Sequence, residues 1–183
     1  MLYLTVTKQD QSTSSYQYHN MKKKKISLLM VCSANICRSP MAEGLMKREL
    51  MMRGLDHLVE VDSAGTHVFK PGHRPDKRAQ QVADKGGINI RKLKARMISE
   101  EDFQRFDHIL AMDEENLHSL QAICPEEYGD KLSLIMSYAP GSDAAEIPDP
   151  YFGNLLGFER VQGLLELGCR GLVEHLITRY GFS

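Results

Sequence analysis

A cysteine and an arginine six positions apart are the residues of this sequence best suited to chemistry. Cys32 and Arg38 lie in the segment Cys-Ser-Ala-Asn-Ile-Cys-Arg-Ser, which covers residues 32–39. A loop curled between them turns successive backbone N–H groups inward and makes a concave site for a tetrahedral oxyanion such as phosphate. The planar guanidinium of Arg38 can grip two oxygens while the sulfur of Cys32 attacks phosphorus in line. The predicted phosphate-binding residues are Ser33, Ala34, Asn35, Ile36, Cys37, Arg38 and Ser39.

Such a nucleophile must be held as a thiolate. A free thiol has a pKa of about 8.5 and is mostly protonated at neutral pH, so the site has to favour the charged form. A helix dipole contributes roughly 0.3–1 kcal/mol, whereas each hydrogen bond to a charged group contributes about 1.5–3 kcal/mol. We therefore expect the loop N–H groups and the Ser39 hydroxyl to provide most of the stabilisation. The alternative interpretation is a buried core cysteine that happens to lie near a surface arginine.

The surrounding pattern predicts the elements that must position this loop. Residues 26–32 form a short apolar run, typical of a strand buried on both faces, and residues 41–54 follow with a helical pattern. Further strands are predicted over 57–65, 107–112 and 131–136, and further helices over 75–87, 99–106 and 154–180. Strands alternating with helices imply parallel pairing and a ligand crevice at the carboxyl ends of the strands. We predict an α/β three-layer fold, with a four-stranded parallel sheet flanked by helices and the phosphate loop after the first strand.

Composition indicates one ordinary domain whose net charge is too small to produce a strong electrostatic field. The chain has 183 residues, is 42% hydrophobic and carries a formal charge of -1, which gives no general attraction to nucleic acid or to an acidic membrane. Its four cysteines are too sparse for a secreted disulfide scaffold, which favours a reducing cytoplasm. Neither the cysteines nor the seven histidines show metal-ligand spacing, so we expect no metal and no cofactor.

The start of the chain is expected to lie outside the fold. Residues 1–21 are polar and without a sustained period, which predicts a disordered extension before a domain over 22–183. The four lysines at 22–25 could be a basic binding patch, but we interpret them as a solvated lead-in to the first strand. No run approaches the roughly 18 apolar residues of a membrane span, and the first twenty residues are too polar for a signal peptide. We therefore expect no membrane partner.

Several motifs resemble, in order, those of the low-molecular-weight protein tyrosine phosphatase family. They are VCSANICRSPMAEG at 31–44, DSAGT at 62–66, PD at 75–76, KARMI at 94–98, FDHILAMDEENL at 106–117 and PDPYFG at 148–153. The resemblance covers about residues 26–180. It implies a phosphatase that hydrolyses phosphotyrosine in protein substrates through a cysteinyl-phosphate, with Cys32 as nucleophile and Arg38 as phosphate clamp. A bacterial tyrosine kinase is a candidate substrate, and we expect a monomer or weak dimer.

Asp149 is the candidate general acid. Cleavage of a phosphotyrosine ester releases a phenolate, whose conjugate acid has a pKa near 10, so protonation of the leaving oxygen should matter. Asp149 lies between two prolines in the only extended loop, roughly 137–154, and is followed by two aromatic residues. An Asp-Pro pair is often only a turn, but the aromatic residues and the upstream loop favour catalysis.

The resemblance also implies supporting residues. Asn35 and Ser63 would hold the shape of the loop, and an apolar slot for the substrate ring would be formed by Ile36, Phe69, Tyr151 and Phe152. Ordinary packing is the alternative role for these side chains. Cys37 is a predicted redox partner of Cys32, with simple packing under the loop as the alternative.

Two positions depart from the family pattern. Ala34 stands where the family usually has glycine, so a left-handed backbone there would cost roughly 1–2 kcal/mol. Leu93 stands where many members have a histidine, so one support of Asn35 is expected to be absent or replaced.

Two other functions compete with hydrolysis. An arsenate reductase can use the same fold and loop, but its redox relay needs two further cysteines close together, whereas Cys124 and Cys169 are far apart in sequence. A non-catalytic phosphotyrosine-binding module would keep the phosphate site but lose the nucleophile or the acid. This chain retains both.

Overall fold

The fold is built on a four-stranded parallel sheet. The computed structural model describes residues 25–182, so the predicted extension over 1–21 and most of the lysine run lie outside the described residues. The strand order is β2-β1-β3-β4, and all three pairings are parallel. The strands are β1 (Ile26–Cys32), β2 (Val59–Gly65), β3 (His108–Ala111) and β4 (Leu132–Leu134). The predicted fold class is confirmed.

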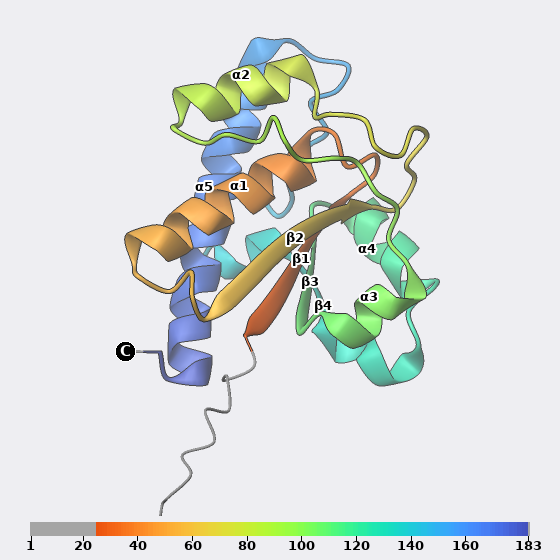
Figure 1. The fold of residues 1–183 in the computed structure, drawn as a ribbon, viewed down its shortest axis with the longest axis vertical. Coiled ribbons are helices and arrows are strands. Elements are labelled where there is room, and N and C mark those ends of the chain that lie inside the picture. Colours follow the sequence, from red (N-terminus) through yellow and green to blue (C-terminus); the bar gives the residue numbers. More distant parts are fainter. Residues whose placement is uncertain (1–24, 183) are drawn as a thin grey trace, which may run out of the picture.

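Helices cover both faces of the sheet and make the three layers visible in Figure 1. One face carries α1 (Arg38–Met52), α2 (Lys77–Lys85) and α5 (Leu155–Tyr180), which pack on one another. The other face carries α3 (Glu100–Arg105) and α4 (Glu114–Gln121). Two short 3₁₀ helices, η1 (Glu126–Lys131) and η2 (Ile135–Tyr138), flank β4.

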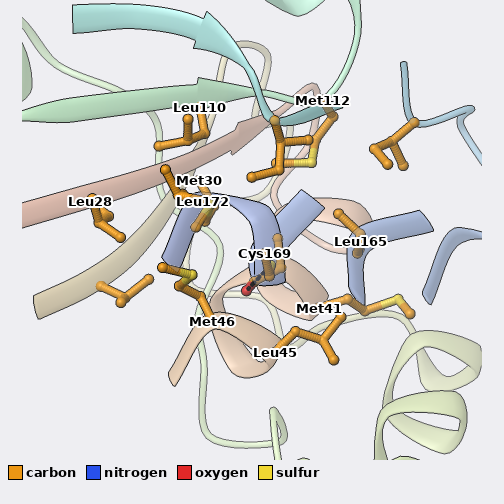
Figure 2. Close-up of a cluster of buried hydrophobic side chains, with 14 of the residues drawn as sticks. Leu28, Met30, Met41, Leu45, Met46, Leu110, Met112, Leu165, Cys169 and Leu172 are labelled. Carbon is orange, nitrogen blue, oxygen red and sulfur yellow. Dashed lines mark hydrogen bonds between the residues drawn. The ribbon is translucent and has the colours of Figure 1, made fainter. Parts of the chain in front are cut away.

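Alternating side chains of β1 fill both cores. Leu28 and Met30 are fully buried among the residues of α1 and α5, whereas Leu29 and Val31 are fully buried on the α3 side. Figure 2 shows the first of these clusters, to which α1 contributes Met41, Leu45 and Met46, and α5 contributes Leu165 and Leu172. Because both faces of β1 are packed, the strand that ends at Cys32 is fixed in the middle of the molecule.

The elements depart from their predicted limits at two places that matter. Helix α1 begins at Arg38, three residues earlier than predicted, because Pro40 suits the first turn of a helix, where its missing N–H is not needed. The fourth strand ends at Leu134, and the next residues form η2 instead. There the chain passes so close to α5 that a Cβ at Gly171 would lie 1.6 Å from the carbonyl oxygen of Tyr138.

The remaining predicted elements are present with shifts of one to three residues at their ends. The predicted capping box of α3 is formed, and Asp102 accepts a 2.9 Å hydrogen bond from the backbone N–H of Ser99. Helix α4 and the short η1 were not predicted from the pattern. None of the helices within residues 25–182 is both long and apolar enough to cross a membrane.

Candidate active site

The phosphate loop joins the end of β1 to the start of α1 at the carboxyl edge of the sheet. Asn35, with φ of 54°, is the only non-glycine residue with positive φ among the described residues. Asparagine tolerates this left-handed backbone better than most residues. The strained position is therefore Asn35, and the cost considered for Ala34 does not arise. The loop lies against the end of β2, where a Cβ at Gly65 would meet the Ser33 carbonyl oxygen at 2.6 Å.

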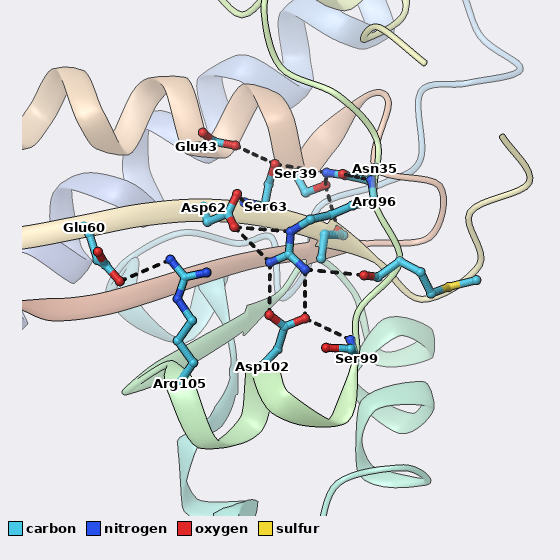
Figure 3. Close-up of polar contacts among 12 residues, drawn as sticks. Asn35, Ser39, Glu43, Glu60, Asp62, Ser63, Arg96, Ser99, Asp102 and Arg105 are labelled. Atoms are coloured by element: carbon cyan, nitrogen blue, oxygen red, sulfur yellow. Dashed lines mark hydrogen bonds and ion pairs between the residues drawn. The ribbon is translucent and has the colours of Figure 1, made fainter. Parts of the chain in front are cut away.

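The side chain of Asn35 ties the loop to three partners, and Figure 3 shows it at one end of a network of polar contacts. Its amide nitrogen donates to Ser39 Oγ at 2.9 Å and to Ser63 Oγ at 3.0 Å. Its amide oxygen accepts from the backbone N–H of Arg96 at 2.9 Å. Leu93, the second departure, packs against the core instead. The acceptor of Asn35 is thus satisfied by a backbone group, so this support is present in another form.

The Cys32 sulfur lies 3.0 Å from Ser39 Oγ. Because Asn35 donates to that oxygen, the Ser39 proton is available to the sulfur or to the Ala64 carbonyl oxygen at 3.2 Å. Behind Asn35, Ser63 Oγ donates to the buried carboxylate of Glu43 at 2.6 Å. In this series of hydrogen bonds each donor has an acceptor. The Ser39 hydroxyl can therefore stabilise a thiolate at Cys32 by donating a hydrogen bond to the charged sulfur.

Arg38 is held in one orientation by groups from two other loops. Only 1% of the residue is exposed. Its Nη1 donates to Asp113 and, at 3.0 Å, to the carbonyl oxygen of Ile147, and its Nη2 donates to Asp149 Oδ2 at 3.0 Å. Burial alone would lower the pKa of Arg38, but Cys32 and the two carboxylates raise it above its ordinary value. The guanidinium is therefore a fixed positive charge beside the sulfur.

Asp149 lies at the mouth of a pocket of about 280 Å³. Its side chain is 47% exposed, and its Oδ1 accepts a 3.0 Å hydrogen bond from the Tyr151 backbone N–H. The aromatic rings of Tyr151 and Phe152 meet edge to face, and Phe69, which lines the same pocket, is 89% exposed. The pocket lining is Cys32, Ser33, Ala34, Ile36, Cys37, Arg38, Phe69, Asp149, Tyr151 and Phe152.

Ten of the sequence-predicted site residues thus share one pocket. The other three, Asn35, Ser39 and Ser63, are buried, and Asn35 contacts both serines. Among the described residues, no group of three histidine, cysteine, aspartate or glutamate side chains could hold a metal ion.

Two residues that contribute to the site, Asp113 and Asn116, are not among those predicted from the sequence. Asp113 caps α4 by accepting from the Asn116 backbone N–H at 2.7 Å, and its other oxygen pairs with Arg38. The Asn116 side chain donates to Ser33 Oγ at 3.0 Å. A usable signal existed, because Asp113 follows a buried strand at the carboxyl edge of a parallel sheet, where ligands bind.

A bridge at the start of α2 was also missed. The Asp76 backbone N–H donates to the Ile36 carbonyl oxygen of the phosphate loop at 2.8 Å. The Asp76 carboxylate accepts from Arg78 Nε at 3.0 Å and Nη2 at 2.9 Å. Arg78 Nη1 in turn donates to the Gly153 carbonyl oxygen at 2.9 Å, and its guanidinium lies 5.7 Å from the centre of the Tyr151 ring. These contacts connect the phosphate loop to the loop that carries Asp149.

The remaining cysteines differ in surroundings. Burial, and then the charge of Asp76, raise the pKa of the Cys37 thiol above its ordinary value. Burial raises the pKa of Cys169 to about 12. Cys169 lies in the cluster on the α1 side of the sheet, whereas Cys124 packs on the α3 side.

Comparison with known proteins assigns the family. A model described as low molecular weight phosphotyrosine protein phosphatase matches residues 27–179. The low molecular weight protein-tyrosine-phosphatase YfkJ of Bacillus subtilis is 38% identical over 149 residues, which are 81% of this chain and 94% of that protein. A crystal structure of a protein tyrosine phosphatase from Entamoeba histolytica is 36% identical, with a TM-score of 0.81 over 86% of this chain and 99% of that one. The YwlE arginine phosphatase of Bacillus subtilis is 27% identical, with a TM-score of 0.75 over 82% and 95%.

The fold, the loop and these relatives define a small α/β phosphatase. The chain belongs to the low molecular weight phosphotyrosine protein phosphatase family.

Proposed function

We propose that this protein hydrolyses phosphotyrosine in protein substrates through a phosphate ester on the sulfur of Cys32. The observation that carries the proposal is the pocket itself, because Cys32, Arg38 and Asp149 line one cavity with apolar and aromatic walls. A nucleophile, a fixed cation and a proton donor are the groups that transfer of a phosphoryl group from a phenol requires.

In the first step the phosphate dianion of the substrate enters the loop and accepts hydrogen bonds from the Arg38 guanidinium in place of Asp149. The sulfur of Cys32 forms a bond to phosphorus while the bond from phosphorus to the tyrosine oxygen breaks. Asp149, released from Arg38 and protonated by solvent before the bond breaks, delivers that proton to the departing phenolate oxygen. The Ser39 hydroxyl stabilises the thiolate before attack, since its oxygen lies 3.0 Å from the sulfur.

In the second step water replaces the tyrosine. Asp149, now ionised, accepts a proton from the water, whose oxygen bonds to phosphorus as the bond from sulfur to phosphorus breaks. Inorganic phosphate leaves and the Cys32 thiolate is restored. Arg38 balances the charge of the transferring group in both steps, and its contact with Asp113 keeps the guanidinium in place.

The walls of the pocket support the choice of phosphotyrosine. Ile36, Phe69 and Tyr151 provide apolar surface around an opening that ends at the sulfur. A tyrosine ring can pack between such walls and still place its phosphate in the loop. The shorter side chain of phosphoserine would leave phosphorus short of the sulfur.

The alternatives have less support. An arsenate reductase of this fold would need two downstream cysteines together, but Cys124 and Cys169 pack on opposite faces of the sheet. A binding module has no need of an acid at the pocket mouth, where Asp149 lies.

The test is a comparison of turnover on matched peptides that carry phosphotyrosine, phosphoserine or phosphoarginine, beside an assay of arsenate reduction. Phosphoarginine is included because one structural relative is an arginine phosphatase. We expect turnover of phosphotyrosine alone. Cys32→Ser should abolish it yet still bind vanadate, because the backbone and Arg38 build the anion site. Substantial turnover by that variant would disprove the mechanism, and preference for another substrate would disprove the assignment.

A further inference from the structure

One side of the pocket is lined by Phe69, which lies on a loop segment fastened to the phosphate loop, and a second segment lies against the first. Residues 66–76 begin with the N–H groups of Thr66 and His67 on the carbonyl oxygens of Cys32 and Ser33, at 2.9 and 2.8 Å. They end with the 2.8 Å contact from Asp76 to Ile36. The segment therefore arches over the pocket, and Phe69, which lines it, lies on this arch.

The second segment, residues 91–96, runs beside the first. The Gly72 N–H donates to the Ala95 carbonyl oxygen at 2.7 Å, and the Ala95 N–H donates to the His73 carbonyl oxygen at 2.8 Å. Arg74 Nη1 donates to the Arg91 carbonyl oxygen at 3.0 Å. Figure 1 shows both segments next to each other, beyond the ends of β1 and β2. We call residues 67–74 and 91–95 together the basic rim.

The basic rim has one sign of charge. Its sequences, His-Val-Phe-Lys-Pro-Gly-His-Arg and Arg-Lys-Leu-Lys-Ala, contain five lysine or arginine residues, two histidines and no carboxylate. All of these cationic and histidine side chains are exposed, namely His67, Lys70, His73, Arg74, Arg91, Lys92 and Lys94. Within residues 25–182, Arg91 is the only one of these five lysines and arginines that forms an ion pair, and its partner is Asp84.

Apart from Asp84, three carboxylates from neighbouring parts of the structure are paired with arginines outside the basic rim. Asp76 is occupied by Arg78, while Asp62 and Asp102 are both occupied by Arg96, as Figure 3 shows for the latter group. A chain with a formal charge of -1 thus concentrates positive charge at one edge of its pocket. Charge clustered beside a pocket raises the local concentration of oppositely charged ligands.

We propose that the basic rim binds acidic side chains that flank the phosphotyrosine in the protein substrate. This inference rests on the proposed function and adds a preference to it. Lys70 follows Phe69 directly, so the positive charge begins where the wall of the pocket ends. An extended peptide advances roughly 3.3 Å per residue, which places residues two to four positions from the phosphotyrosine over the rim.

The expected size of the preference for acidic peptides follows from the exposure of the rim cations to solvent. Exposed charge pairs are individually weak and are screened by salt, so the preference should come from several of them together and should fall with ionic strength. We expect roughly a fivefold to tenfold preference in kcat/KM for an acidic over a basic peptide at low salt, mostly lost in about 0.5 M salt.

The experiment uses phosphotyrosine peptides of equal length with glutamate, alanine or lysine at the flanking positions, placed on either side of the phosphotyrosine in separate sets. The variant Lys70→Glu with Lys94→Glu changes the rim. The control variant Lys25→Glu with Arg170→Glu changes the net charge by the same amount, at positions far from the pocket. Each kcat/KM is divided by that of the same variant on p-nitrophenyl phosphate, which is too small to reach the rim. The rim variant should lose or reverse the preference, and the control should keep it.

Equal rates on all three peptides by the wild type, or an unchanged preference in the rim variant, would overturn the inference. Cosedimentation with anionic vesicles, or binding to single-stranded RNA, that depends on Lys70 and Lys94 without any peptide preference would also overturn it. Absence of turnover on every phosphotyrosine peptide is a different result, because it contradicts the proposed function itself.

Discussion

The proposed nucleophile and the proposed acid depend on their neighbours in opposite ways. Cys32 is buried and contacts a hydroxyl whose own partners are fixed, so its surroundings are set by the fold. Asp149 is half exposed, and the proposed mechanism requires it to exchange its contact with Arg38 during the reaction. The sulfur therefore needs rigidity from its loop, whereas the carboxylate needs a neighbour that it can release.

The role proposed for Asp149 can be separated from a role in loop shape. Asp149→Ala should lower turnover of phosphotyrosine by roughly 10²-fold or more, but should affect much less an aryl phosphate with a strongly acidic leaving group, since such a group departs without a proton. The alkaline decline of the wild-type rate should disappear in the variant. Both are measured by steady-state kinetics over a pH series. An equal loss on both substrates, with the alkaline limb intact, would assign the acid to another residue.

Cys37 is expected to protect the nucleophile from oxidation. Peroxide converts the Cys32 thiolate to a sulfenic acid, and attack by the Cys37 sulfur then forms a disulfide and releases water. The raised pKa of Cys37 keeps it a thiol, so Cys32 reacts first. Wild-type enzyme treated with peroxide should regain activity in thiol reductant, whereas Cys37→Ser should recover much less. The measurement is recovered turnover, with Cys124→Ser as the matched control.

Equal recovery in wild type and Cys37→Ser would show that Cys37 only packs beneath the loop. Poor recovery in Cys124→Ser as well would indicate damage unrelated to the pair. Because Cys124 packs in the other core cluster, it should not respond.

At the scale of elements, the start of α2 connects the phosphate loop to the loop that carries Asp149. Asp76 contacts the phosphate loop through its backbone and Arg78 through its carboxylate, and Arg78 reaches the carbonyl oxygen of Gly153. Helix α2 is anchored by the buried Ala79 and Val82. A helix packed in the core thus helps to position the loop that carries the half-exposed Asp149.

Removal of this bridge should affect the step that needs a proton. Arg78→Met keeps the aliphatic stem but loses the contacts to Asp76 and Gly153. We expect turnover of phosphotyrosine to fall about tenfold, since small displacements of a catalytic group are costly, with a smaller fall for an aryl phosphate with a good leaving group. Lys77→Met, an exposed neighbour without such contacts, is the control.

Arg78→Lys should restore little, because an ammonium lacks the planar fork that reaches both partners. A uniform loss on both substrates, accompanied by a lower midpoint of unfolding, would mean that Arg78 supports the fold and not the acid loop.

Much of this arrangement could be predicted because it depends on local pattern. The apolar run of β1, the turn after it and the spacing from Cys32 to Arg38 place the nucleophile and its clamp without reference to the rest of the chain. The pairing of Asp113 with Arg38 and that of Arg78 with Gly153 could not be predicted in that way, because the partners lie 75 positions apart in sequence. The limit of β4 was also wrong, since the close approach of α5 to Tyr138 is a tertiary contact without a local signal.

At the scale of the whole molecule, α5 closes one face of the sheet and is tied to β3 near its end. His108 of β3 is buried, and its Nε2 lies 2.8 Å from the hydroxyl of Tyr180. Its ring also meets His175 edge to face. Burial first, and then the charges of Arg179 and His175, lower the pKa of His108, while Asp107 acts to raise it. The folded protein therefore favours the neutral imidazole.

This cluster should make stability fall in acid. In the unfolded chain the histidine has a pKa of about 6.5, so unfolding takes up a proton below that pH. The contribution of His108 is fully present above pH 6.5 and is lost as pH falls from there toward the lower folded pKa. His108→Gln keeps a hydrogen-bonding side chain and should flatten the dependence of unfolding free energy on pH below about 6.5. Urea unfolding at several pH values measures this, and His57→Gln, an exposed position, should keep the wild-type slope.

The way in which the basic rim is attached has a consequence for how such proteins diverge. Its two segments are joined to each other and to the phosphate loop mainly by main-chain groups, such as the N–H of His67 on Ser33 and the N–H of Gly72 on Ala95. Main-chain contacts do not depend on which side chain a residue carries. Mutations can therefore change the charges of the rim in descendants of this gene while the reacting groups keep their positions. The choice of protein substrate can thus evolve independently of the chemical reaction.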